Sequence, residues 1–548
     1  MKNGLLVRGL SLAVVFALNA SATSVMLDGK SANSSQIVEI SRGAKVEIDE
    51  NAMKRVKKSH DVLLEAAKTG HKIYGLTVGV GLNKDRQMVD PSGNLSTEVI
   101  EASKQFNTGL IHAHCGGVGD DMDIKTARAV LATRLNNMLF GGTGVQSEVV
   151  ELYKDFLNHD IVPVMPTKGS MGEADITILG HVGLAMIGEG EVYYKGKKMA
   201  ASDALKKAGL KKLSPFGKDS LSILSSNAYS AALGALALEE MRHLSKISKY
   251  VYAISLEAFN GNIAPMHQEA NRLRPFPDYV RVSEQIRGIL EGSYLWNQDD
   301  ARALQDPLSY RDAAYILGTL DSSIDRLEHL MMIQFNSSDD NPGVSVDVSS
   351  QSERFQEKKV YVEGKDFKGA VVPTANFEPL PWVIAFEEAA ISLAHNSAAS
   401  AQRTIKLSDD GFTKLTRFLG TDKTVHAFGA MQKPFVALAG ENRALANPVS
   451  LNHVPVAGNI EDVATNAPLA VSRVRMQIEN LYAILGMELM HAAQAIDLRK
   501  QKNPELKLSP ATEQLYREYR KIVKFLEEDR PLSNDFKNSS SFLKNYNY

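Results

Sequence analysis

The chain has 548 residues, of which 44% are hydrophobic and 23% charged, a composition that supplies a large buried core and excludes an intrinsically disordered protein. Lys and Arg number 62 and Asp and Glu number 64, so the formal net charge is only -2. This balance argues against a nucleic-acid or membrane-surface partner, and we expect a small-molecule substrate. The single cysteine, Cys115, excludes an intrachain disulfide and a cysteine-rich metal site.

Residues 1–22 have the three regions of a secretory signal peptide. Lys2 and Arg8 supply positive charge, Leu10 to Leu18 is apolar, and Ala20-Ser21-Ala22 resembles a cleavage site before Thr23. The apolar run is too short to span a bilayer, and we expect no membrane span later in the chain. The pattern predicts an exported protein, periplasmic in a Gram-negative bacterium; the alternative is an N-terminal helix that stays attached.

Residues 23–548 are predicted to form a single, all-α unit. After Pro468, and also from Ala228 to Leu244 and from Phe386 to Ala401, apolar residues recur at steps of three and four. We expect active-site loops mainly in residues 60–220, a central bundle of long helices at about 221–500, and a C-terminal helical extension at 501–548. The alanine-rich faces of these helices favour close packing and a symmetric oligomer. The exceptions are a short hairpin at 188–197 and an exposed polar excursion at 344–369.

Four segments, in this order and spacing, resemble the histidine and aromatic amino-acid ammonia-lyase family. The resemblance covers nearly the whole mature chain, and it implies a homotetramer whose active sites are built from loops of several subunits. The segments are Tyr74–Gly81, Lys168–Asp175, Gln305–Arg311, and Gly440–Arg443 followed by Asn459–Asp462.

The second segment departs from the family pattern. The family has Gly-Ser-x-Gly-Ala-Ser-Gly-Asp, whose Ala-Ser-Gly cyclises into the methylidene-imidazolone electrophile (MIO). This chain has Gly-Ser-Met-Gly-Glu-Ala-Asp at 169–175, so one residue is missing and the required serine and glycine are absent. Ser170 lies outside the triad. We therefore expect no MIO cofactor at Gly172–Asp175.

The resemblance places Tyr74, in the glycine-rich loop, at the position of the catalytic base. A phenolate in a glycine-flanked loop can remove a proton if its pKa is lowered, whereas the alternative is a packed core tyrosine. Relatives usually carry a second catalytic tyrosine where this chain has Leu308. Tyr310, two residues further on, is the candidate to replace it.

Candidate substrate-binding residues follow from the same resemblance. Arg311 matches the arginine that binds the substrate carboxylate, with Gln305 in the same segment, although a structural salt bridge would explain Arg311 as well. Asn227 matches an asparagine that helps hold the carboxylate, but it could be a helix cap. His114 stands where the family contacts the substrate ring.

Two further matches concern the ring and the amine. Glu461 matches the glutamate that histidine-specific relatives place near the imidazole, or is a carboxylate near a helix start. Lys433 replaces an apolar residue and could pair with Glu461 or with a sulfur on the ring, or could extend to solvent at the rim of the bundle. Phe377 and Trp382 could hold a quaternary ammonium over their ring faces, or be core residues.

We expect no metal site. His112, His114 and Cys115 lie close in sequence, but no carboxylate or cysteine pair follows at the spacing of a zinc site. The acidic pair Asp339-Asp340 is better explained as a turn that ends a helix.

The missing triad suggests a reaction that does not need it. MIO activates a primary amine for departure, whereas a trimethylammonium group has no lone pair to add to an electrophile and departs directly as trimethylamine. Loss of the triad is therefore what a betaine-type substrate would allow. In this respect the chain resembles the branch of the superfamily that lacks MIO, and the resemblance implies a carbon-nitrogen lyase that eliminates trimethylamine from ergothioneine, a histidine derivative, to give thiourocanate. The alternatives are a histidine or aromatic amino-acid ammonia-lyase and a non-catalytic periplasmic binding protein.

Overall fold

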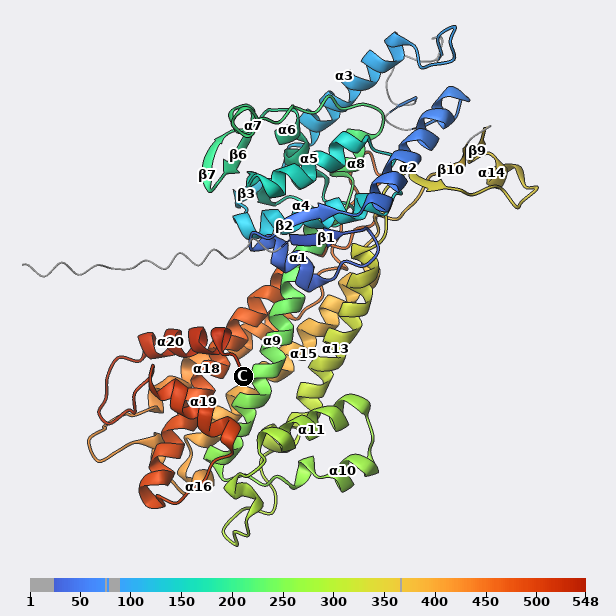
Figure 1. The fold of residues 1–548 in the computed structure, drawn as a ribbon. Helices are drawn as coiled ribbons and strands as arrows, with labels where there is room; N and C mark the ends of the chain where they lie inside the picture. Colours follow the sequence, from blue (N-terminus) through green and yellow to red (C-terminus); the bar gives the residue numbers. More distant parts are fainter. Residues whose placement is uncertain (1–23, 74–75, 78–88, 365–366) are drawn as a thin grey trace, which may run out of the picture.

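The computed structural model describes residues 24–73, 76–77, 89–364 and 367–548. Four long helices run side by side through the centre of the molecule (Figure 1). They are α9 (Ala228–Phe259), α13 (Ala313–Phe335), α15 (Leu380–Leu407) and α18 (Ala467–Lys502). Three of them are the helices predicted from apolar periodicity, and the mostly helical bundle confirms the predicted fold class.

α18 illustrates why these segments become core helices. Pro468 occupies the first turn, where its missing N–H costs no hydrogen bond, and the helix packs on both α9 and α15. The predicted apolar stripe is buried along its length. It consists of Val471, Val474, Ile478, Leu481, Leu485 and Leu489.

The N-terminal half sits at one end of the bundle and combines helices with three small sheets (Figure 1). β1 and β2 are parallel, β3 pairs with β5, and β4-β6-β7 is antiparallel. The predicted hairpin at 188–197 is confirmed by β6 and β7. The elements are β1 (Ser24–Leu27), α1 (Ser34–Ser41), β2 (Lys45–Ile48), α2 (Glu50–Lys68), α3 (Thr97–His114), β3 (Val118–Asp121), α4 (Ile124–Leu139), α5 (Ser147–Asn158), β4 (Ile161–Pro163), β5 (Pro166–Lys168), α6 (Ile176–Met186), β6 (Glu191–Tyr194), β7 (Lys197–Ala200), α7 (Ala201–Ala208) and α8 (Asp219–Leu224).

The remaining elements connect or flank the long helices. Most lie at the other end of the bundle, and α20 packs along α18. They are α10 (Gln268–Leu273), α11 (Pro277–Ile289), α12 (Leu308–Arg311), β8 (Gly343–Val346), α14 (Phe355–Lys358), β9 (Tyr361–Glu363), β10 (Lys368–Val372), α16 (Asp410–Thr413), α17 (Gln432–Leu445), α19 (Pro510–Arg520) and α20 (Ser533–Asn545), with short 3-10 turns at Ala264–Met266, Tyr294–Trp296, Arg417–Leu419 and Gly429–Met431.

The segment expected to be an exposed polar excursion is partly a sheet, in the order β8-β10-β9. Val344, Val362 and Val371 are buried against Val62 and Leu63 of α2 and form a second, smaller core. The apolar residues of this sheet lie in strands of three to five residues, too short to produce a recognisable alternation in a polar sequence.

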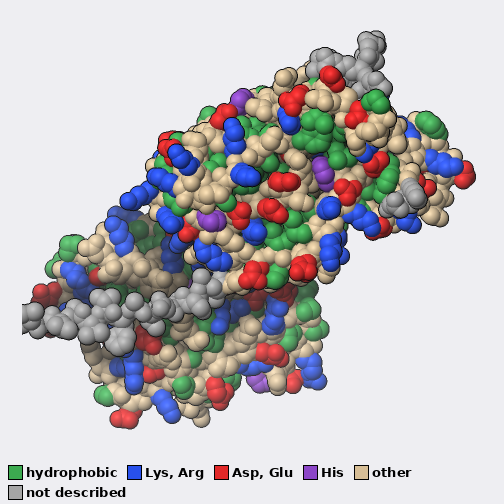
Figure 2. Space-filling view, turned by 45° about the horizontal axis from the view of Figure 1, so that its top comes forward, with side chains coloured by type: hydrophobic (Ala, Val, Ile, Leu, Met, Phe, Trp, Pro, Cys, Tyr) green, Lys and Arg blue, Asp and Glu red, His purple; other side chains and the backbone are tan. Residues whose placement is uncertain are grey.

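Among the described residues, neither the hydropathy of the helices nor the face seen in Figure 2 changes the expectation of a small-molecule partner. One segment, Asp219–Phe259, is long and apolar enough to cross a bilayer, but its most apolar window is wholly buried in the bundle, as in the core helix of many proteins. Acidic and basic side chains are interspersed over the face seen in Figure 2 and do not separate into large patches of one sign.

Candidate active site

The loop at 169–175 lies where three helices begin. α6 starts after Asp175, α9 after Asn227 and α18 after Asn466. The Asp175 N–H donates to the Ser226 carbonyl (2.7 Å), and the Asn466 N–H donates to the Met171 carbonyl (2.6 Å). The positive ends of three helix dipoles therefore meet at this loop, which favours negative charge there.

The loop backbone tolerates little substitution. Gly172 has φ +91°, and a Cβ added to it would lie 2.5 Å from Thr465 Oγ1 and 2.6 Å from the Ala467 nitrogen. Ala174 also has positive φ, 60°, an uncommon conformation for a residue with a side chain. Its N–H donates to Asn227 Oδ1 (3.1 Å), which helps to hold it there.

Asn227 connects this loop to the segment before α15. Besides accepting from Ala174, its side chain donates from Nδ2 to the Phe377 carbonyl (2.8 Å). Its own N–H donates to Asp339 Oδ2 (2.8 Å). The side chain makes no capping bond to α9, so the alternative of a helix cap does not describe it. Asn227 therefore holds the backbone of the 169–175 loop at Ala174 and the backbone of the segment before α15 at Phe377.

A buried ion network includes Asp339, the carboxylate that accepts from the Asn227 N–H. Arg134 pairs with Asp339 (2.9 Å) and Asp340 (3.1 Å), and Lys218 pairs with Asp340 (2.8 Å). All four side chains are at most 2% exposed. The acidic pair expected to be a helix-ending turn is therefore half of a charge-balanced cluster. No group of three or more metal-binding side chains occurs in the part of the chain that the structure describes.

Glu173 occupies the position of the missing triad. Burial, then the charge of the Glu378 carboxyl and a side-chain hydrogen bond with it, raise the pKa of Glu173 to about 8, to which Glu461 adds least. A backbone N–H from Thr465 opposes the shift. Glu173 Oε1 is buried and has no hydrogen-bond partner among the described residues. The raised pKa favours the protonated form of Glu173 in the ligand-free protein.

The next carboxyl in the loop has a structural function. Asp175 is fully buried and accepts from the Ser170 hydroxyl (2.6 Å) and from the N–H and hydroxyl of Ser230 (both 2.8 Å). Burial raises the pKa of Asp175 to about 6, and these hydrogen bonds oppose the shift. Ser170 thus ties the two ends of the loop together.

The structure brings several predicted site residues to this loop. Asn227 and the half-buried Phe377 are joined to it by hydrogen bonds, and Glu461 lies within electrostatic range of Glu173. His114 ends α3 beside α6, where its carbonyl would lie 2.9 Å from a Cβ on Gly180. Tyr74 lies outside the described residues, so its proposed role rests on the sequence.

Gln305, Tyr310 and Arg311 lie at the opposite end of α9. The Tyr252 hydroxyl donates to the Tyr310 carbonyl (2.9 Å), and the helix from Asn227 to Tyr252 is about 40 Å long at roughly 1.5 Å per residue. Arg311 is half-buried and donates to Gln305 Oε1 (3.4 Å). One chain alone therefore does not bring Arg311 to the loop.

Tyr310 is buried in the core, so the expectation that it acts in catalysis is wrong. Its side chain is 1% exposed, its ring stacks on Phe259 at 4.3 Å between centroids, and its hydroxyl lies 3.1 Å from the Ser255 hydroxyl. Burial raises the pKa of Tyr310 well above its ordinary value. A buried, neutral phenol that contacts only core groups cannot replace the second catalytic tyrosine that is absent at Leu308.

Lys433 and Glu461 do not pair within one chain. Lys433 is exposed at the start of α17, and nearby Phe435 packs edge-on against His491 of α18. His491 is about 36 Å along α18 from Ala467, near which Glu461 lies. Within the described part of the chain, no ion pair joins the two residues, so a pair would need another subunit.

Two other candidates have structural roles. Trp382 is 4% exposed and donates from Nε1 to Gln334 (3.0 Å), so it is a core residue and does not hold substrate. His112 lies 2.8 Å from Glu189 at the surface. Burial raises the pKa of Cys115 to about 11, which leaves it a poor metal ligand.

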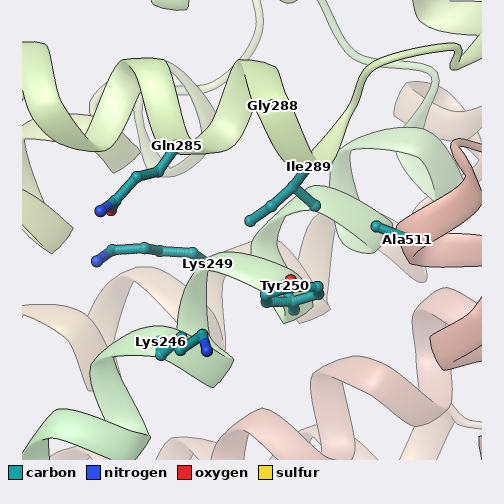
Figure 3. A pocket seen from close by; sticks show the side chains of 7 residues that line it. All are labelled: Lys246, Lys249, Tyr250, Gln285, Gly288, Ile289 and Ala511. Atoms are coloured by element: carbon teal, nitrogen blue, oxygen red, sulfur yellow. The ribbon is translucent and has the colours of Figure 1, made fainter. Parts of the chain in front are cut away.

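A cavity of about 350 Å³ lies elsewhere, between α9, α11 and the start of α19 (Figure 3). Its Lys249 is paired with Asp321 (2.7 Å), and the ring of Tyr250 stacks on C-terminal Tyr548 at 4.9 Å. Lys249 and Tyr250 thus already have structural partners, and the cavity contains none of the predicted site residues.

Sequence reasoning missed Glu173, Glu378 and Thr465 as parts of the site. The deletion in the 169–175 motif indicates only that MIO cannot form. It does not indicate a role for Glu173, which stands where the triad begins in the family. Glu378 directly follows the predicted Phe377, and Thr465 lies four residues after the predicted Glu461. Glu378 and Thr465 can be recognised as site residues only in the structure, where both lie next to the Glu173 carboxyl.

Comparisons with known proteins fit this geometry. The aromatic amino acid lyase family matches residues 33–521. Histidine ammonia-lyase of Streptococcus gordonii is 28% identical over 511 residues, covering 93% of each chain. The crystal structure of ergothionase from Treponema denticola, in complex with desmethyl-ergothioneine sulfonic acid, is 37% identical with a TM-score of 0.83, covering 95% of this chain and 98% of that one. Histidine ammonia-lyase from Trypanosoma cruzi, 23% identical with a TM-score of 0.81 over 95% of this chain and 93% of its own, shares the fold.

This chain therefore belongs to the aromatic amino acid lyase family. It is a lyase of the ammonia-lyase superfamily, and such an enzyme acts on a small molecule.

Proposed function

We propose that this lyase eliminates trimethylamine from ergothioneine, a betaine-type histidine derivative, to give thiourocanate, and that it does so without MIO. The observation that carries the proposal is the loop at 169–175, where Glu173, with an unpartnered carboxyl oxygen, takes the place of the triad. The likeness to ergothionase, at 37% identity over nearly the whole chain, supports the same reaction.

The residues of the loop do not fit the MIO group. Its formation needs a serine hydroxyl to leave as water and a glycine nitrogen to attack, and positions 173–175 are Glu, Ala and Asp. The Ala174 N–H is bonded to Asn227, and the Asp175 carboxyl is engaged by Ser170 and Ser230. We therefore assign no step to this group.

A quaternary amine makes the electrophile unnecessary. In the proposed reaction Tyr74 removes the β-proton, the C–N bond breaks, and its electron pair leaves with neutral trimethylamine while the C–C double bond forms. Arg311 would bind the substrate carboxylate through two parallel N–H donors. His114 and Glu461 would lie near the imidazole ring, and Lys433 near its sulfur.

The proposal requires an oligomer, and we propose a homotetramer. Arg311 and the 169–175 loop are at opposite ends of α9, so a complete site needs two chains. Apolar side chains that would suit such contacts are exposed on the central helices. They include Ile384 (46%) and Ile391 (48%) of α15, Val436 (46%) of α17, and Leu469 (51%) and Met476 (49%) of α18.

We also propose that the protein is exported and that residues 1–22, which lie outside the described residues, are removed. N-terminal sequencing of protein recovered from a periplasmic fraction should begin at Thr23. Recovery from the cytoplasm with Met1 intact would contradict export.

The deciding experiment incubates the purified protein from Thr23 onward with ergothioneine and follows trimethylamine together with the ultraviolet band of thiourocanate. Histidine and tyrosine serve as control substrates. We expect trimethylamine from ergothioneine and no ammonia from the controls. Ammonia from histidine would establish a conventional ammonia-lyase, and binding of ergothioneine without any product would establish a binding protein.

A further inference from the structure

The carboxyls around Glu173 differ from the buried pair Asp339 and Asp340 at this end of the bundle. Asp339 and Asp340 are balanced by Arg134 and Lys218. Glu173, by contrast, is influenced by Glu378 and Glu461, and none of these three forms an ion pair with Lys or Arg within the described part of the chain. Adjacent carboxyls without a counter-ion are unfavourable, so such a cluster favours binding of a cation from outside.

A second observation points to a ligand at the same place. Thr465 is only 3% exposed, yet its hydroxyl has no hydrogen-bond partner among the described residues, and neither has Glu173 Oε1. The Thr465 N–H donates to the Glu173 carboxyl, and its Oγ1 faces the backbone of Gly172. Buried polar atoms are nearly always paired, so two unpaired atoms on adjoining residues indicate a group that only a ligand supplies.

We infer that Glu173 and Glu378 form the subsite that holds the quaternary ammonium group of the substrate, an inference that rests on the proposed function. A trimethylammonium group has no N–H, so charge and the C–H···O contacts of its polarised methyl groups would hold it against the unpaired Glu173 oxygen and the Thr465 hydroxyl. The loop thus places a negative group beside the amine that departs.

The binding of a fixed cation should be coupled to proton release. Burial and the neighbouring Glu378 carboxyl raise the pKa of Glu173 to about 8, which favours the protonated form at pH 7 in the free protein. A permanent positive charge beside it favours the ionised form and lowers that pKa, because opposite charges stabilise each other. The complex therefore forms with loss of up to about one proton to the buffer.

The kinetic signature is a change in KM more than in kcat. The amine loses its positive charge as the C–N bond breaks, so a carboxylate beside it stabilises the bound substrate more than the transition state. Removing that charge should raise KM about tenfold and leave kcat unchanged or higher. A residue that acted as catalytic acid or base would instead lower kcat.

The first test measures binding without turnover. Glycine betaine carries the trimethylammonium and carboxylate but has no β-proton to lose, and 3,3-dimethylbutanoate is the isostere in which an uncharged tert-butyl group replaces the trimethylammonium. We expect calorimetry at pH 7 in phosphate and in Tris to give different apparent enthalpies for betaine, which reveals proton release, and no such difference for the isostere. Equal enthalpies for betaine in both buffers, or equally tight binding of the isostere, would overturn the inference.

The second test uses variants. Glu173→Gln and Glu378→Gln should each raise the KM for ergothioneine, and Glu173→Gln should abolish the buffer dependence for betaine. Glu191→Gln, on the exposed β6, is the matched control and should match the wild type. Circular dichroism melting identifies a variant that fails to fold, in which case the other variant decides.

The two hypotheses fail in distinguishable ways. If the wild type releases trimethylamine and both variants keep its KM, the subsite is refuted and the proposed function stands. If the wild type never releases trimethylamine but binds betaine with proton loss, the subsite stands and the proposed function is refuted.

Discussion

The two ends of α9 both contain buried charge, but they use it differently. At the C-terminal end, Arg403 forms a two-pronged pair with Glu488 (2.6 and 2.9 Å), and the Ser400 hydroxyl donates to the same carboxylate (2.6 Å). Each charge of this bidentate pair is compensated by the other, and the pair links α15 to α18. At the N-terminal end, the balanced Arg134 network adjoins the unbalanced carboxyls around Glu173.

The difference separates structural charge from charge available for binding. Buried ion pairs have little left to offer a ligand, because each charge is already compensated. The Arg134 network holds Asp339, Asp339 holds Asn227, and Asn227 holds Ala174 next to Glu173. The balanced cluster therefore fixes the position of the unbalanced one.

The largest expected effect contrasts Tyr74, the proposed base, with the buried Tyr310. Tyr74→Phe should lower kcat by about 10²- to 10⁴-fold, because it removes the proposed base. Tyr310→Phe should leave kcat within about twofold and cost about 1 kcal/mol of stability, because its hydroxyl contacts only core groups. Trimethylamine release and urea unfolding provide the two measurements. Comparable losses of kcat in both variants would return Tyr310 to the site.

The next prediction breaks the balanced network. Arg134→Met leaves Asp339 and Asp340 buried with Lys218 alone, and it should lower the free energy of unfolding by about 3–5 kcal/mol. Arg326→Met removes an arginine that is 53% exposed and pairs with Glu388, and as a control it should change stability by no more than about 0.5 kcal/mol. Chemical unfolding followed by fluorescence gives both values. Similar small losses would mean that the network is not needed.

A third prediction concerns pH at the other end. Burial raises the pKa of Glu257 to about 7, where it accepts from the Ser509 N–H and the Thr512 hydroxyl. The native state thus keeps the Glu257 proton up to a higher pH than the unfolded chain does. The free energy of unfolding therefore falls as the pH rises from the ordinary pKa of a glutamate to about 7.

Glu257→Gln should therefore remove up to about 3 kcal/mol of the stability lost between pH 5 and pH 8. Urea unfolding at the two pH values measures the change, and Glu291→Gln, an exposed carboxylate just after α11, should follow the wild type. A Glu257 variant whose stability falls with pH as steeply as that of the wild type would refute the assignment.

The smallest expected signal is a partial recovery of activity, which tests whether Tyr74 and Arg311 of one site come from different chains. Tyr74→Phe and Arg311→Met should each be nearly inactive alone. Co-assembled from equal amounts, they should regain roughly a quarter of wild-type activity if a site takes Tyr74 from one chain and Arg311 from another. A site built from a single chain would give no recovery, since every chain carries a defect.

The long helices could be predicted from the sequence because each carries many apolar residues at helical spacing, as α18 does from Val471 to Leu489. The family could be predicted because its motifs survive around the deletion at 172–175. The short sheet β8-β10-β9 could not, because its strands carry too few apolar residues to define a period.

The sequence by itself determined the class of fold, the loss of the Ala-Ser-Gly triad and the identity of the residues available for catalysis, because periodicity and motifs are local properties. Only the tertiary structure decided that Tyr310 is buried, that Asn227 bridges Ala174 and Phe377, and that Glu173 meets Glu378 and Glu461. Burial and charge compensation depend on which distant segments pack together, and no spacing along the chain specifies them.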